Sequence, residues 1–248
     1  MPMSRSTIRL FALLVLAATA GCASGPPRMQ LAPELAGIEA WPVVGGRGAG
    51  HKLEFGRWQV TAPASFVTQS NSIGGGDPLT LPTGTEVKVE SSTRLIEDLV
   101  AFEFTLESRA GSNRSASADC HAAFRLANRT VVNSRGSDET ELTQPGFPHF
   151  NCDFAGTWPG KLSLRPHYTQ RDVGTSDFSN HSWRIRTSPW ARIGYEFLRD
   201  GKVAAAVETF GDGRVWMRPD LSPDEADQLA LVATALLYFD SLLELRDN

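Results

Sequence analysis

The run Leu229–Phe239 constrains the fold of this chain more than any other part of the sequence. Its eleven residues are apolar except for Thr234 and the hydroxyl group of Tyr238. The preceding residues Ser222–Glu225 provide an N-cap, a proline at the first helical position and a capping-box glutamate, so we expect a helix over about 223–245. A helix that is apolar on every side is buried on every side or lies in lipid, and this run covers only about 16 Å, too little for a bilayer core. We therefore predict that the protein's own strands surround this helix.

The segments before the helix alternate apolar and polar residues, which is the pattern of strands with one buried face. Ile193–Phe197 and Val203–Val207 form one such pair, and the turn Asp200-Gly201 between them favours a tight hairpin, because both residues accept positive φ. Further strands are expected at 53–60, 87–89, 100–106, 118–124, 150–154, 162–164, 183–185 and 215–217. The sequence thus predicts a single, mainly β domain over 51–248, an antiparallel β-barrel or strongly curled sheet around a hydrophobic C-terminal α-helix.

The stretch Ile193–Leu243 resembles the C-terminal part of tubby-like domains, including the LURP-one-related proteins and the phospholipid scramblases. The resemblance is carried by a strand, the turn Arg199–Lys202, a return strand that begins at Val203, a third strand and the apolar helix. It implies a closed antiparallel barrel wrapped around a central C-terminal helix. The resemblance covers about a fifth of the chain. It brings no ligand site, because the basic residues with which tubby proteins bind phosphoinositides have no counterpart that aligns here.

The N-terminus has the order of a secretory signal peptide. Arg5 and Arg9 precede the apolar run Leu10–Ala20, which ends in small residues. Cys22 follows directly after Gly21, and this arrangement resembles the cleavage site of a bacterial lipoprotein signal. The resemblance implies a signal peptide over 1–21 and a mature chain whose Cys22 carries acyl chains, palmitate among them. More than one acyl chain gives stable attachment to a membrane.

Two details of this N-terminal segment refine the prediction. Thr19 stands where lipoprotein signals most often have leucine, and the alternative is an ordinary signal peptide cut near Ala20 that leaves Cys22 as a free thiol. Ala23 replaces the aspartate that keeps lipoproteins at the inner membrane, so we expect the outer membrane of a bacterial envelope, facing the periplasm. The glycine-rich composition of 22–50 predicts a flexible tether, part of which packs on the domain.

The two remaining cysteines, Cys120 and Cys152, are predicted to form a disulfide. Each shares the apolar face of a strand-like segment, and two cysteines in an oxidising compartment usually pair. The alternative is a metal site formed by Cys120, His121, His149 and Cys152. Adjacent strand residues point to opposite faces, so Cys120 and His121 are poorly placed to bind one ion. We therefore expect no metal ligands.

Composition and motifs limit the function. Two of the 24 basic residues and none of the 28 acidic residues precede Cys22, which leaves a mature chain with a net charge of −6. An acidic chain argues against nucleic-acid binding. The sequence contains no His-Glu-x-x-His or Gly-x-Ser-x-Gly motif, and its five histidines are scattered.

The sequence therefore predicts a membrane-anchored envelope lipoprotein with a non-enzymatic structural, interaction or ligand-binding role. No cofactor is expected. The partners are the membrane, through lipid on Cys22, and an envelope protein or small ligand whose identity the sequence leaves open. The alternative is an envelope hydrolase with an active site assembled from dispersed residues, which a pocket combining histidine with a carboxylate or serine would support.

Overall fold

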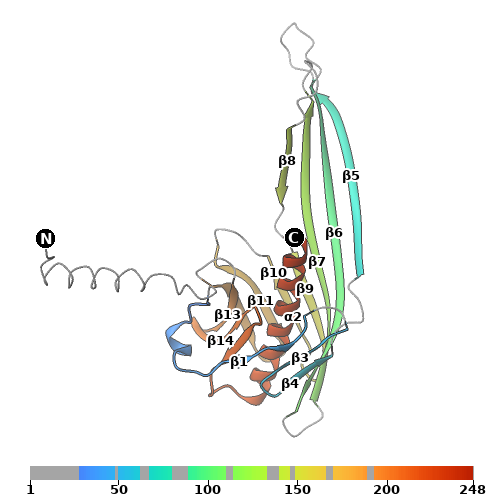
Figure 1. Cartoon of the computed structure of the whole chain (residues 1–248). Helices are drawn as coiled ribbons and strands as arrows, with labels where there is room; N and C mark the ends of the chain where they lie inside the picture. The colour runs from blue at the N-terminus through green and yellow to red at the C-terminus, as the bar shows by residue number, and fades with distance from the viewer. Residues whose placement is uncertain are drawn as a thin grey trace, which may run out of the picture.

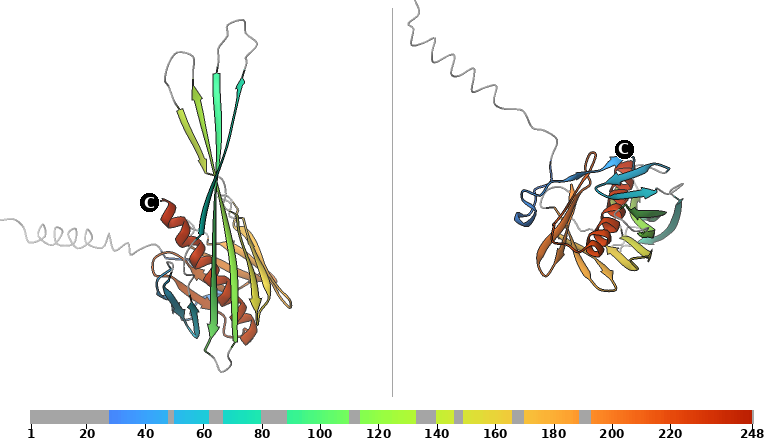
Figure 2. Two further views of the ribbon diagram at one scale, coloured as in Figure 1. Left: turned by 90° about the vertical axis from the view of Figure 1, so that its right-hand side faces the viewer. Right: turned by 90° about the horizontal axis from the view of Figure 1, so that it is seen from below.

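The computed structural model describes residues 28–47, 50–61, 67–79, 89–109, 114–132, 140–145, 149–165, 170–188 and 193–247. These residues form one antiparallel sheet that curls into a nearly closed barrel, and the long helix α2 (Pro223–Asp247) runs through the ring of strands (Figure 1, Figure 2). The predicted fold class, a mainly β chain curled around a C-terminal helix, is confirmed. The relationship to tubby-like domains stays a prediction.

The strands follow the chain from residue 41 to residue 217. They are β1 (Trp41–Pro42), β2 (Val44–Gly45), β3 (Lys52–Phe55), β4 (Trp58–Thr61), β5 (Val67–Leu79), β6 (Val89–Ser108), β7 (Arg114–Val132), β8 (Thr140–Pro145), β9 (His149–Gly156), β10 (Gly160–Leu164), β11 (Asp172–Phe178), β12 (Ser182–Thr187), β13 (Gly194–Arg199), β14 (Lys202–Glu208) and β15 (Arg214–Met217). Their order in the sheet is β1-β15-β14-β13-β12-β11-β10-β9-β7-β6-β4-β3-β2. Most neighbours in the sheet are therefore also neighbours in the chain.

One short segment lies at both ends of this path. β1 pairs with β15, β2 pairs with β3, and only Val43 separates β1 from β2. The Val43 amide donates a hydrogen bond to the carbonyl oxygen of Gly213, 3.2 Å away. The run Trp41–Gly45 thus bridges the first and last strands of the barrel and brings the two ends of the sheet together.

The helix α2 fills the interior of the barrel. Every residue of Leu229–Phe239 is fully buried, as the sequence predicted. Aromatic rings from the strands pack against it: Phe102 and Phe104 contact Tyr238, and Phe150 stacks on Phe239 with ring centroids 4.4 Å apart. By length and composition Pro223–Leu243 could cross a membrane, but 83% of its most apolar window is buried inside the protein. The strands therefore supply the apolar surroundings that the helix needs.

The local signals around the helix act as predicted. The Ser222 amide donates to Glu225 Oε2 at 2.8 Å, and the Glu225 amide donates to Ser222 Oγ at 3.3 Å, which together make a capping box. Asp200 and Gly201 adopt φ values of 51° and 77° in the hairpin between β13 and β14. These turn and cap residues set where the last strands and the helix begin.

Part of the segment 22–50, predicted as a tether that packs in part on the domain, lies among the described residues. Residues 28–45 belong to the folded domain, because they include the barrel-closing segment and a short cover that contains the 3₁₀ turn η1 (Pro33–Leu35). Met29 and Leu35 are buried in a second apolar cluster, which lies on the outer face of β13–β15. The other buried members of that cluster are Ala32, Ile193, Leu198, Val203, Ala206 and Trp216. The sequence left open which residues of the segment pack, because its apolar residues are widely spaced and show no regular period.

A four-stranded arm projects from one end of the barrel (Figure 1). The strands β6 and β7 contain 20 and 19 residues, and only part of each pairs with the barrel strands β4 and β9. The remaining parts pair with β5 and β8, so the arm has the strand order β5-β6-β7-β8. The projecting part of β6, about ten residues, is about 33 Å long. The views show no described element over either face of this projecting sheet.

Candidate functional site

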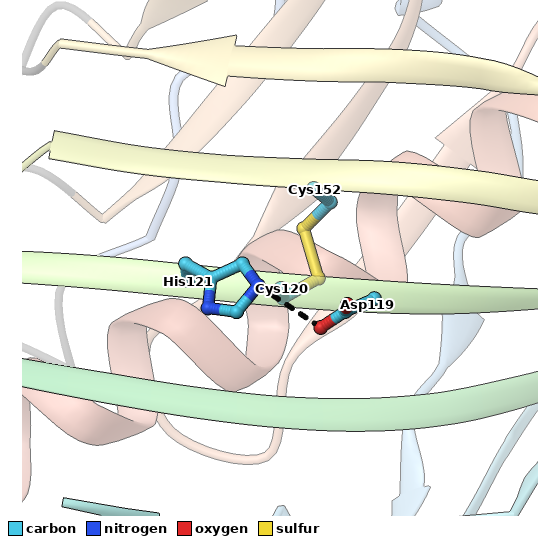
Figure 3. Close-up of a disulfide and its surroundings, with 4 residues drawn as sticks. All are labelled: Asp119, Cys120, His121 and Cys152. Carbon is cyan, nitrogen blue, oxygen red and sulfur yellow. Dashed lines mark ion pairs between the residues drawn. A yellow bond between two sulfur atoms is a disulfide. The ribbon is translucent and has the colours of Figure 1, made fainter.

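The disulfide between Cys120 and Cys152 crosslinks two neighbouring barrel strands. The two cysteines are directly opposite each other in β7 and β9, with Cα atoms 4.1 Å apart, and the structure joins them as the sequence predicted (Figure 3). Both side chains are buried in the core that contains α2. The bond closes a loop of 32 residues, which stabilises a fold by about 3–4 kcal/mol in the chain-entropy account. Its role is structural.

The alternative metal site at these cysteines does not form. The two sulfur atoms are bonded to each other, while the side chain of His121 is exposed and its Nε2 lies 3.2 Å from Oδ1 of the exposed Asp119 (Figure 3). Cys120 lies between these two residues in the strand and points to the opposite face. In the described ranges no group of three or more histidine, cysteine, aspartate or glutamate side chains is arranged to hold a metal ion.

A buried carboxylate attaches the N-terminal end of α2 to the barrel wall. Asp227 accepts a hydrogen bond of 2.7 Å from Trp58 Nε1 and one of 2.8 Å from Arg57 Nη2. The Arg57 guanidinium also lies 4.9 Å from the Trp58 ring centroid, and Arg114 Nη1 lies 3.7 Å from the other carboxylate oxygen. A buried carboxylate is tolerated only when it is paired and hydrogen-bonded. These contacts fix the helix to the strands and leave the carboxylate no free role.

The histidine and carboxylate pair that would support a hydrolase occurs beside the helix N-terminus. His181 Nε2 lies 3.1 Å from Glu225 Oε1, and Arg199 forms an ion pair with the same carboxylate. The other oxygen of Glu225 accepts the Ser222 amide in the capping box, and Ser222 Oγ accepts the Glu225 amide. No hydrogen bond joins Ser222 to His181 in the described structure. The cluster therefore lacks an activated nucleophile and serves to cap and orient the helix.

A second polar cluster holds the C-terminal half of α2. Asp240 is buried and accepts hydrogen bonds from the Tyr195 hydroxyl, at 2.8 Å, and from the Thr209 hydroxyl. The Arg47 side chain donates to the carbonyl oxygens of Thr209 and Gly211. This network connects the helix, β13, the loop after β14 and the end of the barrel-closing segment. The helix is thus held by hydrogen bonds near both of its ends and by apolar packing between them.

Two further buried glutamates lie on the side of the barrel that carries β13 and β14. Glu196 accepts hydrogen bonds from Arg171 and Arg186. Glu208 accepts the Met29 amide at 2.7 Å and forms an ion pair with Arg28 at 3.1 Å. The second contact attaches the start of the described chain to the barrel wall. Sequence reasoning missed both clusters, because their partners are far apart in the chain.

A hollow of about 230 Å³ lies between the β13–β14 hairpin and the segment that leads into α2. It is lined by Arg199, Asp200, Lys202, Ala204, Arg218, Asp220 and Leu221. The hydrogen bond from Arg218 holds the pKa of Asp220 below its usual value. Arg199 is paired with Glu225, so most of the charge in this hollow is already neutralised within the protein. The hollow does not bring together a base and a nucleophile.

Cys22, the predicted lipidation site, lies outside the described residues. Comparison of the chain with known protein families, curated proteins and solved structures finds no match. The candidate functional features therefore come from the fold alone. They are a barrel whose interior is filled by its own helix, a wall whose buried carboxylates are all bonded in the described ranges, and an arm that extends beyond both.

Proposed function

We propose that this protein is an extracytoplasmic lipoprotein of the bacterial envelope, anchored through Cys22, that acts without catalysis by presenting its arm to an interaction partner. The observation that carries the proposal is the division of the molecule into a filled barrel and a projecting arm. The helix α2 occupies the barrel interior, which argues against a carrier that holds a ligand in its lumen. The arm contributes nothing to barrel closure, so its length calls for another use.

The position of the N-terminal cover supports this arrangement. Arg28 and Met29 bind Glu208 at the end of β14, and only six residue steps separate Arg28 from Cys22. Such a span reaches about 21 Å at most. In the ring of strands, β14 and β7 are separated by the five strands β9–β13, which places the cover across the barrel from the strands of the arm. A lipid on Cys22 would hold the β14 side near the membrane and leave the arm on the far side.

The bonding of the polar clusters supports a non-enzymatic role. Glu225 is engaged by Arg199, His181 and the Ser222 amide at once, so it is a fixed part of the helix cap. A general base has to be free to take a proton from a nucleophile within hydrogen-bond reach. The histidine and carboxylate pair in this protein holds the helix instead, which removes the main structural argument for the hydrolase alternative.

The anchor is tested by the variant Cys22→Ala in the full chain. We expect wild-type protein to incorporate labelled palmitate and to sediment with membranes, and Cys22→Ala to incorporate none. Cys120→Ala/Cys152→Ala is the matched control, because it removes cysteines that no lipoprotein signal precedes, and it should keep the label. Label on the Cys22→Ala protein would refute lipidation at this residue.

The interaction role is tested by trimming the arm. Removing 70–98 and 126–145 and closing each cut with a short glycine turn shortens the paired strands in register, because Gln69 is opposite Leu99 and Leu126 is opposite Pro145. We expect the trimmed chain to remain lipidated and to lose the higher-mass complexes that wild-type protein forms after chemical crosslinking of intact cells. Unchanged complexes would contradict the interaction role while leaving the anchor in place.

A further inference from the structure

The strand β5 ends the arm with an open edge. All thirteen of its residues, from Val67 to Leu79, pair with β6 in one unbroken register. In the described ranges no strand pairs with its other side. Alternate residues of an antiparallel strand direct their amide and carbonyl groups away from the paired neighbour. The outer side of β5 therefore presents a row of backbone donors and acceptors that can accept another strand.

We propose that this edge of β5 pairs with β5 of a second copy of the chain, so that two arms join into one continuous eight-stranded sheet across a two-fold axis. The inference rests on the interaction role proposed above and names the partner for it. In an antiparallel pair, every second opposed pair exchanges two hydrogen bonds. An overlap of ten residues would therefore form about ten new bonds.

The opposite edge of the arm shows how an edge is normally protected. The strand β8 has only six residues, Thr140–Pro145, with a glutamate near one end and a proline at the other. Short strands, charges and proline are the devices that prevent edge-to-edge pairing. By contrast, β5 is more than twice as long. Its charged residue and its proline, Asp77 and Pro78, lie together near one end, so the ten residues from Val67 to Gly76 contain neither. The register with β6 also contains no bulge that would turn this edge away.

A second copy fits this edge better than an unrelated strand for two reasons. A neutral strand has no like charges to oppose one another when it pairs with itself; the single charged residue, Asp77, lies near one end. In an antiparallel pair that overlaps over 67–77, Asp77 faces the start of the partner strand and not Asp77 of the other copy. A second copy also brings an identical open edge on an identical arm, whereas any other partner would need an open edge of its own.

The two-fold axis predicts which residues meet. Opposed residues in an antiparallel pair are of the same type, either both hydrogen-bonded or both not, so the axis passes through a residue and its own counterpart. For the uncharged span the central residue is Asn71 or Ser72. A cysteine placed at the axis would face the same cysteine of the other copy at about 4.5–5.5 Å between Cα atoms, within the range of a disulfide.

The experiment is a single-cysteine scan at positions 70–74 in the full, membrane-anchored chain. Oxidation of intact cells is followed by electrophoresis without reductant. We expect a band at twice the monomer mass that is strongest at one position and falls on both sides of it. Thr143→Cys on β8 is the matched control on the protected edge and should remain monomeric. The native disulfide is buried in the barrel and should give no dimer.

Each outcome decides the inference. The inference would be overturned if none of the scan positions crosslinked more strongly than Thr143→Cys. It would also be overturned if the mass of the crosslinked band showed that the partner is not a second copy of the chain. Either result leaves the interaction role standing if trimming the arm still removes the complexes. If trimming changes nothing and the scan also fails, both proposals are refuted.

A pair of proline variants distinguishes loss of edge-to-edge pairing from unfolding of the arm. Thr68→Pro and Gln69→Pro change adjacent residues of β5 outside the cysteine scan, so one removes an amide that points to β6 and the other removes an amide on the open edge. When each is combined with the cysteine that crosslinks best, we expect both to lose the dimer band. Only the proline on the open edge should keep wild-type resistance of the arm to limited proteolysis. Dimer formation that survives both prolines would overturn the pairing.

Discussion

The barrel and the arm are both built from antiparallel strands but are stabilised in different ways. In the barrel, the strands β3, β4 and β9–β15 bury side chains in the apolar clusters of the domain, and the buried carboxylates Asp227, Asp240 and Glu208 all have partners. In the arm, four strands pair along their backbones without a described layer on either face. Sheets normally need a packed face for stability of their own. The barrel thus has a packed interior of its own, whereas the proposed pairing of two arms would extend a sheet that has no such described layer.

The largest effect on stability is expected from a charge placed inside the barrel. Leu236 is fully buried at the middle of the helix, so Leu236→Asp places an unpaired charge in the core. Such a charge costs several kcal/mol in practice, and a domain of this kind has about 5–15 kcal/mol of total stability. We expect this variant not to fold, while the volume-conserving Leu236→Met melts close to wild type. Thermal unfolding followed by circular dichroism is the measurement, and similar melting of both variants would show that the helix is not central.

Removing the disulfide should weaken the barrel without abolishing it. Cys120→Ala/Cys152→Ala frees the loop of 32 residues between the two strands. We expect the free energy of unfolding in urea to fall by about 3–4 kcal/mol. The arm sheet, which has no disulfide in the described ranges, should keep its protease resistance. A loss below 1 kcal/mol would mean that the pairing of β7 with β9 already restricts the unfolded chain.

Removing one anchor of the helix should have a moderate effect. Asp227→Ala leaves the buried Trp58 Nε1 group without its acceptor and the Arg57 guanidinium without its ion pair. An unsatisfied buried donor costs about 1–3 kcal/mol. The matched control is Asp224→Ala, which removes a mostly exposed carboxylate one turn earlier in the same helix and should change stability little. Equal losses in the two variants would indicate that charge at the helix N-terminus, and not the buried contact, is responsible.

The smallest expected effect tests the arm itself. Trimming 70–98 and 126–145 should shift the melting temperature of the barrel by only a few degrees, because the strand residues that it removes pair only with other strands of the arm, and none of them pairs with β4 or β9. This result would sharpen the contrast between the two regions. A large fall in melting temperature would contradict it, because the arm would then stabilise the barrel that carries it.

The sequence predicted the elements whose signals are local. The capping box at Ser222 and Glu225, the Asp200-Gly201 turn and the all-round apolar helix each depend on residues within a few positions of one another. The barrel followed from these signals, because a helix without a polar face has to be enclosed. The disulfide was also predictable, since the two remaining cysteines share apolar faces.

The missed features depend on partners that are distant in the sequence or on the backbone alone. Asp227 finds Trp58 across 169 positions and Glu208 finds Met29 across 179, and no local pattern announces such contacts. The arm escaped prediction for another reason. The sequences of its outer strands β5 and β8 lack the apolar alternation by which strands are recognised.

The segment Trp41–Gly45 sets the order in which this protein can be completed. It pairs with β15 through Trp41 and Val215, which are synthesised far apart in time. At about 5–20 residues per second, the ribosome delivers the second strand roughly ten to thirty seconds after the first. The barrel also cannot enclose α2 before residues 223–247 have been synthesised. Closure therefore waits for β15 and α2, and until they have been made the growing chain carries an apolar sheet without the helix that covers it, a state in which protection by a chaperone is of most value.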